Sequence, residues 1–267
     1  MTTNDIITGD CLEVLPRLPA RSVNLVFTSP PYPGQMGNGQ SVGQWLDWLG
    51  RVLECLLPAL AANAVVALNV AFKRTPAGWH DARVFSAVPP AFEATGYRPL
   101  DTYIWHKTNG AQNGPLAYAD APGYEPIFVY TNAERPGDIL FNAQRKPYAA
   151  KSISGDGAAR IGYGRLKEPN GDGARQTNVI SLPTNASDGA RPRARGVSFP
   201  LALPERFILQ YTRPGDCVLD FCAGVGTTCR KARELGRRTI GIEIDPDEAA
   251  TARAWLARPV QAGLCYE

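Results

Sequence analysis

The stretch Val218-Leu-Asp-Phe-Cys-Ala-Gly-Val-Gly-Thr-Thr228 joins an apolar run to a turn with two glycines and then to a segment with helical character. A short apolar run followed by a helix is typical of the strands of α/β sheets. Glycines let the backbone approach a ligand closely, and the N-terminus of the following helix favours a carboxylate or phosphate. The stretch therefore predicts an α/β fold with a ligand site at the end of this strand.

A second strand, predicted at residues 239–243, ends in Glu243, which is well placed to bind the hydroxyl groups of a ribose. Together, the two strands indicate a nucleoside cofactor. A nicotinamide-binding fingerprint is the alternative, but it requires a third glycine three residues after Gly226, where this chain has Cys229.

The stretch Val23-Asn-Leu-Val-Phe-Thr-Ser-Pro-Pro-Tyr32 is an apolar strand that ends in two prolines and an aromatic residue. Consecutive prolines stiffen the backbone and remove two N–H donors, so the carbonyls of this turn face outward. Ser29 and the Pro30 carbonyl would accept the hydrogens of an exocyclic amino group, and Tyr32 would stack on the base that carries it. The alternative is a proline-rich turn that merely ends a strand.

The composition is that of an ordinary globular protein. The 267 residues are 44% hydrophobic, and no run approaches the roughly 18 apolar residues of a membrane helix. The first residues show no basic region leading into an apolar one, so a cytoplasmic location is expected. The six cysteines and two histidines lack metal-site spacing, so we expect reduced thiols and no metal.

Basic residues are concentrated in one segment. The chain carries +3 in total, whereas residues 144–195 contain ten basic and four acidic residues, a net charge of +6. Such a segment favours nucleic acid as a partner, although any single arginine in it has a solvated loop as the alternative. The candidate DNA contacts are Arg145, Lys146, Arg191, Arg193 and Arg195.

Seven apolar runs predict the strands of one sheet, at residues 6–7, 23–27, 64–70, 102–105, 126–130, 217–221 and 239–243. Helices are predicted at 227–235, at 247–256, and between 45 and 60, where one face carries Trp45, Leu49, Val52, Leu56 and Leu60. Their alternation with strands argues for a parallel sheet. From about 132 to 197 the alternation fails, which predicts a loop-rich lobe.

The two motifs resemble those of the S-adenosylmethionine-dependent DNA amino-methyltransferases of the β class, in which the amine motif precedes the cofactor motif. The resemblance implies a circularly permuted, Rossmann-like methyltransferase sheet of seven strands. It implies a catalytic half at residues 1–131, a target-recognition region at 132–197 and a cofactor-binding half at 198–267. In an unpermuted chain the last helix would lead directly into the first strand. We therefore expect the last helix and the first strand to lie side by side, next to the cofactor.

The resemblance also assigns residues to the cofactor, S-adenosyl-L-methionine. The turn after residue 220 would surround its methionine part, Glu243 would hold the ribose, and the opening Gly9-Asp-Cys-Leu12 would meet the adenine. Trp105, Lys107 and residues 124–130 would wall the base pocket. The catalytic candidates are Ser29, Pro30, Pro31 and Tyr32; the cofactor candidates are Asp10, Cys11, Thr28, Phe199, Pro200, Asp220, Phe221, Cys222, Ala223, Gly224, Gly226, Thr227, Thr228, Glu243 and Ile244.

One segment departs from the family pattern. Before the cofactor strand the family usually carries a histidine and proline and then a basic residue and proline. This chain has Ser198-Phe-Pro-Leu-Ala-Leu-Pro204, which keeps the prolines but not the histidine. Residues 34–43, which contain four glycines, are expected to form a loop that closes over the flipped base.

Serine at the head of the proline pair resembles the cytosine-N4 branch, whereas aspartate is commoner in the adenine-N6 branch. We therefore expect direct methyl transfer to N4 of a flipped-out cytosine in double-stranded DNA, with no cysteine nucleophile. Adenine N6 is the first alternative; an RNA or small-molecule amino-methyltransferase and a DNA-binding protein without catalysis are the others. A cognate restriction endonuclease is a candidate partner, and the sequence leaves the recognised DNA sequence and the oligomeric state open.

Overall fold

The computed structural model describes residues 5–32, 40–71, 73–74, 80–81, 83–109, 123–146, 174–184, 192 and 199–260. For residues 73–74, 80–81, 145–146 and 174 it describes the backbone alone. Most of the loop predicted at 34–43, and the candidate DNA contacts Arg191, Arg193 and Arg195, lie outside the described residues.

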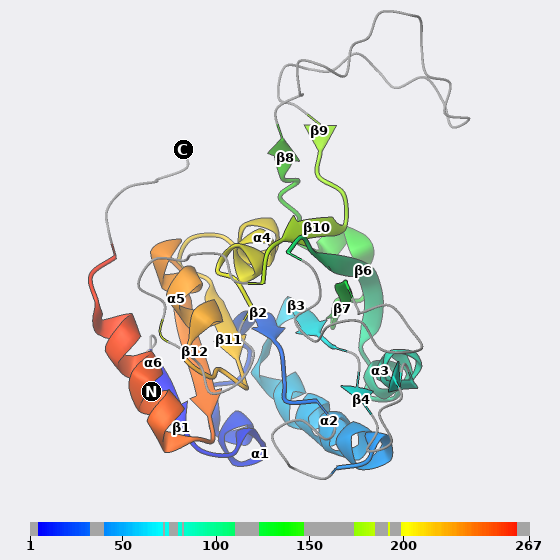
Figure 1. The fold of residues 1–267 in the computed structure, drawn as a ribbon, viewed down its shortest axis with the longest axis horizontal. Helices are drawn as coiled ribbons and strands as arrows, with labels where there is room; N and C mark the ends of the chain where they lie inside the picture. Colours follow the sequence, from blue (N-terminus) through cyan, green and yellow to red (C-terminus); the bar gives the residue numbers. More distant parts are fainter. Residues whose placement is uncertain are drawn as a thin grey trace, which may run out of the picture.

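An eight-stranded sheet forms the centre of the molecule (Figure 1). Its strands, in spatial order, are β1 (Asp5–Thr8), β12 (Arg238–Glu243), β11 (Cys217–Asp220), β2 (Val23–Thr28), β3 (Leu60–Asn69), β7 (Tyr124–Thr131), β6 (Arg98–Lys107) and β10 (Val179–Leu182). Seven of them coincide with the predicted apolar runs, which confirms the α/β fold class and the large central sheet.

The prediction of seven parallel strands is wrong in two respects. First, β7 runs antiparallel to both of its neighbours, β3 and β6. β6 and β7 follow one another in the chain and lie side by side in the sheet, and antiparallel neighbours need no crossover helix between them. Second, β10 is an eighth strand, parallel to β6, inside the segment predicted to be a loop-rich lobe. Its sequence, Val-Ile-Ser-Leu, contains three apolar residues that were not predicted to form a strand, and in the sheet its side chains alternate only between exposed and half-buried positions.

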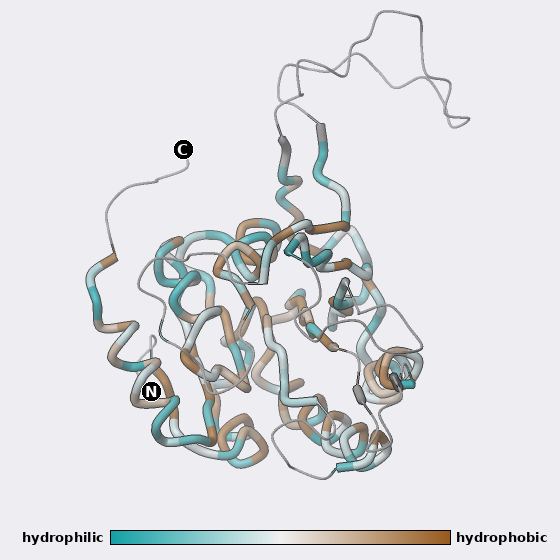
Figure 2. Tube along the Cα trace, viewed as in Figure 1, coloured by the Kyte–Doolittle hydropathy of each residue, from teal (hydrophilic) through white to brown (hydrophobic). Residues whose placement is uncertain are grey.

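Helices cover both faces of the sheet. α2 (Val42–Leu56) and α3 (Arg83–Ala94) lie on one face, and α4 (Ala202–Tyr211), α5 (Thr227–Glu234) and α6 (Pro246–Ala257) lie on the other (Figure 1). The short helix α1 (Cys11–Val14) follows β1. Hydrophobic residues are concentrated along the strands and on the helix sides that face them, as Figure 2 shows.

The remaining elements are short. They are the 3-10 helices η1 (Leu15–Arg17), η3 (Leu57–Ala59) and η4 (Pro136–Asp138), the strand pair β4 (Lys73–Arg74) with β5 (His80–Asp81), and the strand pair β8 (Arg145–Lys146) with β9 (Ala174–Arg175). The helix predicted to run to Leu60 ends at Leu56, because Pro58 cannot continue an α-helix. Leu60 instead opens β3.

Strand β2 shows how the two layers of the core are built. Leu25 and Phe27 are fully buried on the α4 side, where the ring centroids of Phe27 and Phe207 are 5.0 Å apart. Val26 points to the opposite face and packs in the cluster formed by the apolar side of α2. Both faces of this central strand are therefore covered, which explains its nearly continuous apolar sequence.

The reversed direction of β7 gathers polar residues at one edge of the sheet. The other strands run parallel to one another, so their carboxyl ends share this edge, and the amino end of β7 joins them there. Ser29 follows β2, Asn69 ends β3, Lys107 ends β6, and Glu125 lies at the start of β7. Ligands of open α/β sheets bind at this carboxyl edge.

The first strand and the last helix lie side by side, as the sequence predicts. β1 pairs in parallel with β12, and Arg253 of α6 donates from Nη1 to the Ile6 carbonyl and to Thr8 Oγ1, each at 2.9 Å. The circular permutation that this arrangement would reflect stays a prediction. None of the helices in the described ranges has the length and apolar character needed to cross a bilayer.

Gly241 offers a test of the packing between β12 and its neighbours. A Cβ atom at this position would clash with Cδ1 of Ile6 and would lie 2.9 Å from Sγ of Cys229 and 3.1 Å from Cβ of Ala223. We predict that Gly241→Ala lowers the free energy of unfolding by about 1–3 kcal/mol through overpacking. Gly50→Ala in α2 is the matched control, because among the described residues its added Cβ meets nothing within 4 Å beyond its chain neighbours and the backbone of its own helix, and it should raise stability by about 0.5–1 kcal/mol. Urea unfolding of both variants checks the prediction, and a neutral Gly241→Ala would contradict it.

Candidate active site

A cavity of about 420 Å³ opens at the carboxyl edge of the sheet, among the ends of β1, β2, β11 and β12. It brings together all four catalytic candidates and most of the cofactor candidates predicted from the sequence. These lining residues are Ser29, Pro30, Pro31, Tyr32, Asp10, Cys11, Phe199, Asp220, Phe221, Cys222, Ala223, Gly224, Thr227, Glu243 and Ile244. The candidates Thr28, Pro200, Gly226 and Thr228 do not line the cavity, although each is next in the chain to a residue that does.

The turn after β11 has the backbone that its glycines predict. Gly224 and Gly226 adopt φ values of +51° and +86°, which residues other than glycine rarely adopt. A Cβ on Gly226 would also lie 3.1 Å from Cβ of Ala252, so α6 packs directly against this turn. The main-chain N–H of Gly224 donates to Oε2 of Glu243 at 2.7 Å. This bond joins the turn after β11 to the end of β12.

Acidic residues line the cofactor end of the cavity. The described wall contains five carboxylates, from Asp10, Asp220, Glu243, Asp245 and Glu248, and no lysine or arginine. Such a wall favours a ligand that carries positive charge and hydroxyl donors. A carboxylate on the same ligand would find the N-terminus of α5, which begins at Thr227 on the cavity wall.

Burial changes the protonation chemistry of two of these acids. It raises the pKa of Asp220 to about 6, and the nearby charge of Glu243 acts in the same direction. Burial also raises the pKa of Glu243, while the N–H groups of Asp245 and Gly224 that donate to its carboxylate oppose the rise. Both carboxylates therefore gain from a cationic or hydrogen-bond-donating ligand that offsets their loss of solvation.

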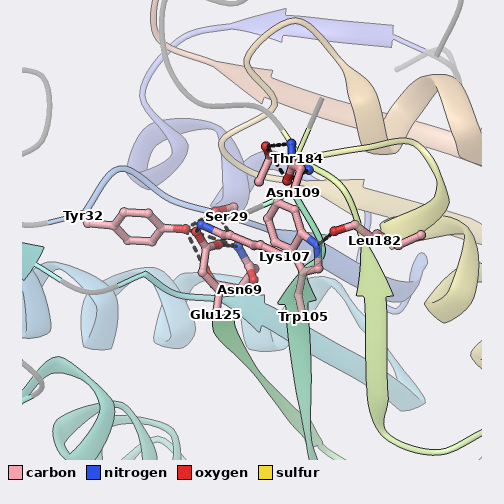
Figure 3. Close-up of polar contacts among 9 residues, drawn as sticks. All are labelled: Ser29, Tyr32, Asn69, Trp105, Lys107, Asn109, Glu125, Leu182 and Thr184. Carbon is pink, nitrogen blue, oxygen red and sulfur yellow. Dashed lines mark hydrogen bonds and ion pairs between the residues drawn. The ribbon is translucent and has the colours of Figure 1, made fainter. Parts of the chain in front are cut away.

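The proline turn after β2 forms the other end of the cavity. The indole Nε1 of Trp45 in α2 donates to the Pro31 carbonyl at 2.9 Å, which ties the turn to the helix. The hydroxyl oxygens of Ser29 and Tyr32 are 2.5 Å apart (Figure 3). Tyr32 thus directs its hydroxyl at the predicted amine acceptor, and its stacking on a base stays a prediction.

Sequence reasoning missed several residues of the site. Asn69 donates from Nδ2 to Ser29 Oγ and Tyr32 Oη, each at 3.3 Å, and to Glu125 Oε2 at 2.7 Å. Its signal was present as a polar residue at the end of the apolar run 64–70, beside the strand that carries the prolines. Other lining residues that were not predicted are Gln40, Trp45, Trp48, Val225, Asp245 and Glu248.

The cysteines of the cavity have the properties of packing residues. The pKa of the Cys222 thiol is raised well above its ordinary value, first by its hydrogen bond with Cys11 and then by burial. A raised pKa keeps the thiol protonated and therefore a poor nucleophile. The five cysteines of the described residues are free thiols, and among those residues no cluster of His, Cys, Asp and Glu could hold a metal ion.

The predicted DNA-contact residues Arg145 and Lys146 form β8. This strand pairs antiparallel with β9, and Figure 1 shows the pair projecting from the sheet next to β10. The backbone therefore places these two residues on a protruding pair of strands. Arg191, Arg193 and Arg195 fall outside the described part of the chain.

A family model described as DNA methylase, of the N6/N4 type, matches residues 23–254. The chain belongs to this DNA methylase family. Among characterised relatives, the type II methyltransferase M.BglII of Bacillus subtilis is 27% identical over 251 residues, which cover 91% of this chain and 66% of the relative. M.SmaI of Serratia marcescens, also a type II methyltransferase, is 26% identical over 274 residues, which cover 95% of this chain and 90% of the relative.

Solved structures share the fold. The PvuII DNA methyltransferase, described as cytosine-N4-specific, superposes with a TM-score of 0.73 at 19% identity, covering 98% of this chain and 88% of its own. A DNA modification methylase from Thermus thermophilus, solved in complex with S-adenosyl-L-methionine, gives a TM-score of 0.64 at 25% identity, covering 97% of this chain and 95% of its own. The methylase family thus accounts for the architecture of the sheet and its helices.

Asp220 makes the stability of the ligand-free protein depend on pH. Its pKa of about 6 in the folded state lies above the ordinary value of 3.8, so protonation stabilises the folded protein. This contribution is complete below pH 3.8 and is lost as the pH rises through 6. We predict that Asp220→Asn raises the free energy of unfolding at about pH 8 by up to about 3 kcal/mol and has little effect at about pH 3.5. Urea unfolding at both pH values tests this, and equal effects at the two would contradict it.

Proposed function

We propose that the protein transfers the methyl group of S-adenosyl-L-methionine to the exocyclic N4 of a cytosine flipped out of double-stranded DNA. One observation carries the proposal: the acidic cofactor end and the proline turn belong to the same cavity. A methyl donor in the acidic end therefore lies next to an acceptor for an amino group. The membership of the chain in the DNA methylase family supports DNA as the substrate.

The residues of the cavity fit S-adenosyl-L-methionine. Its sulfonium and ammonium groups suit a wall of carboxylates, and its ribose hydroxyls suit Glu243. Its carboxylate suits the glycine turn and the start of α5, where backbone N–H groups gather. Asp10, whose Oδ1 also accepts the N–H of Leu12, would lie at the adenine end. When bound, the cofactor supplies an electrophilic methyl group.

The proline turn acts on the exocyclic amino nitrogen of the base, which is the nucleophile. The lone pair of an exocyclic amine is delocalised into the base, which makes the nitrogen unreactive towards a methyl group. Ser29 Oγ and the Pro30 carbonyl would accept its two hydrogens and so favour a tetrahedral nitrogen whose lone pair points at the methyl. Trp45 holds the neighbouring Pro31 carbonyl, which keeps the turn in one conformation. No covalent enzyme intermediate is needed, and the raised pKa of the Cys222 thiol agrees with this.

Ser29 also supports cytosine N4 over adenine N6, because the cytosine branch of the family carries serine at this position. Adenine N6 presents the same two hydrogens to the same acceptors, so it is the second candidate. The protruding β8–β9 pair and residues 132–197 around it would form the target-recognition region, between a catalytic half at 1–131 and a cofactor half at 198–267. The type II relatives further suggest a cognate restriction endonuclease as partner.

Identification of the methylated nucleoside tests the proposal. The purified protein is incubated with unmodified DNA of diverse sequence and methyl-labelled S-adenosyl-L-methionine, and the DNA is digested to nucleosides for mass spectrometry. We predict labelled N4-methylcytosine, and its absence with Ser29→Ala at unchanged cofactor affinity.

Labelled N6-methyladenine would keep the mechanism but overturn the choice of base. Cofactor binding without any labelled DNA nucleoside would reject DNA as the substrate, and parallel incubations with RNA would then identify the alternative.

A further inference from the structure

A single buried amide contacts both hydroxyl groups of the proline turn. Asn69 is the last residue of β3, and only 1% of its surface is exposed. Its Nδ2 lies 3.3 Å from Ser29 Oγ and 3.3 Å from Tyr32 Oη, while these two oxygens are 2.5 Å from each other (Figure 3). The three side chains form a closed triangle of hydrogen bonds, so the rotamers of Ser29 and Tyr32 are held from one point.

A buried ion pair lies behind this amide. Glu125, which is 5% exposed, accepts a hydrogen bond from Asn69 Nδ2 at 2.7 Å through Oε2. Its other oxygen, Oε1, lies 2.5 Å from Lys107 Nζ, and the ammonium sits 5.1 Å from the ring centroid of Trp105. The indole of Trp105 donates in turn to the Leu182 carbonyl at 3.1 Å. The ion pair is therefore anchored on β6, β7 and β10.

Glu125 decides which end of the Asn69 amide faces the turn. An ionised carboxylate only accepts hydrogen bonds, so the NH₂ group must point to it; a reversed amide would place its Oδ1 against Oε2. In the observed orientation Oδ1 is buried and has no hydrogen-bond partner among the described residues. A buried unpaired acceptor costs stability. The orientation of the Asn69 side chain is therefore explained by the hydrogen bonds that its Nδ2 donates, because its Oδ1 gains none.

This orientation has a consequence for Ser29. The Asn69 Nδ2 group carries two hydrogens: one points at Glu125, and the other is shared between the two hydroxyl oxygens, so neither hydroxyl hydrogen can point at the amide nitrogen. Either hydroxyl can donate across the Ser29–Tyr32 contact. When Ser29 donates to Tyr32, Tyr32 can donate in turn to the main-chain carbonyl of Asn69, which lies 3.5 Å from its Oη. In that pattern Ser29 Oγ turns no hydrogen towards the cavity and keeps one lone pair for it. An acceptor of an amino hydrogen needs this arrangement.

We propose that Asn69, held by Glu125 and Lys107, is a positioning residue that sets Ser29 as a hydrogen-bond acceptor for the amino group of the base. The inference rests on the proposed function, since it assigns the network a role in the methyl-transfer step. Asn69, Glu125 and Lys107 do not belong to the described cavity wall, which also lacks Trp105 and the other residues of 124–130 that were expected to wall the base pocket. Because Asn69 contacts Ser29 and Tyr32, the network is proposed to act through these two side chains, and we expect its loss to leave cofactor binding unchanged.

The test compares Asn69→Ala, Glu125→Gln and the double variant with the wild type. Two quantities are measured: the dissociation constant of S-adenosyl-L-methionine, and the single-turnover rate constant of methyl transfer to DNA. We expect each single variant to bind the cofactor within about twofold of wild type and to transfer the methyl group about 10- to 100-fold more slowly, as misplacement of a reacting group does.

The double variant separates positioning from a general loss of structure. If Glu125 acts through Asn69, then Glu125→Gln changes the rate constant by less than about twofold once Asn69 is alanine. Additive losses would overturn the proposal, as would single variants with wild-type rate constants. Should Asn69→Ala fail to fold, Asn69→Ser, which is too short to join Glu125 to Ser29, takes its place in the same cycle.

Asn132 supplies the matched control. Its amide also bridges strands, accepting from Ala64 N at 2.9 Å and donating to the Ala61 carbonyl at 2.8 Å, but at the opposite end of β3 and β7. Asn132→Ala should lower thermal stability and leave the single-turnover rate constant within about twofold of wild type; a loss as large as that of Asn69→Ala would overturn the proposal. A wild type that transfers no methyl group to DNA would instead reject the proposed function, and the inference with it.

Discussion

The parallel pairing of β2 with β11 is the constraint on which the rest of the structure depends. Val218 pairs with Leu25, and Leu219 with Val26. The side chain of Asn24 strengthens this pairing by accepting the N–H of Cys217 at 2.9 Å, although the two residues are 193 positions apart in the chain. Because parallel strands end at the same edge, the proline turn after β2 and the glycine turn after β11 become neighbours. The active-site cavity follows from this pairing.

The two ends of the cavity are suited to different ligand groups. The cofactor end gathers carboxylates whose burial raises the pKa of Asp220 and Glu243, so it is poised for a cationic ligand. The proline turn contains acceptors on a stiff backbone and relies on neighbours for its orientation: Trp45 holds the Pro31 carbonyl, and Asn69 holds Ser29. The reversed strand β7 is essential to the second arrangement, because it delivers Glu125 to the edge where the other strands end.

Much of this organisation could be predicted from local patterns. The apolar runs located seven strands, and the spacing of Trp45, Leu49, Val52 and Leu56 located the buried face of α2. The glycines of the cofactor turn implied left-handed backbone, which Gly224 and Gly226 adopt. The residues of both motifs then met in one cavity because each motif follows a strand directly, and strand ends of a parallel sheet converge.

The features that the sequence did not predict depend on contacts between residues that are distant in the chain. The direction of β7 is set by its neighbours in the sheet and leaves no trace in its own apolar run. β10 is a run of only four residues, three of them apolar, inside a polar segment, and its pairing with β6 exists only once the sheet is assembled. Asn69 read as the end of a strand, because its contacts with Ser29 and Glu125 exist only once three strands are assembled.

The most direct measurement is a crystal structure of the protein with S-adenosyl-L-methionine bound. We predict that the methionine part lies at the turn of Gly224 and Gly226, that the ribose hydroxyls contact Glu243, and that the sulfonium methyl faces Ser29 and Pro30 across the cavity. A cofactor bound outside this cavity, or one whose methyl group points away from the proline turn, would contradict this prediction.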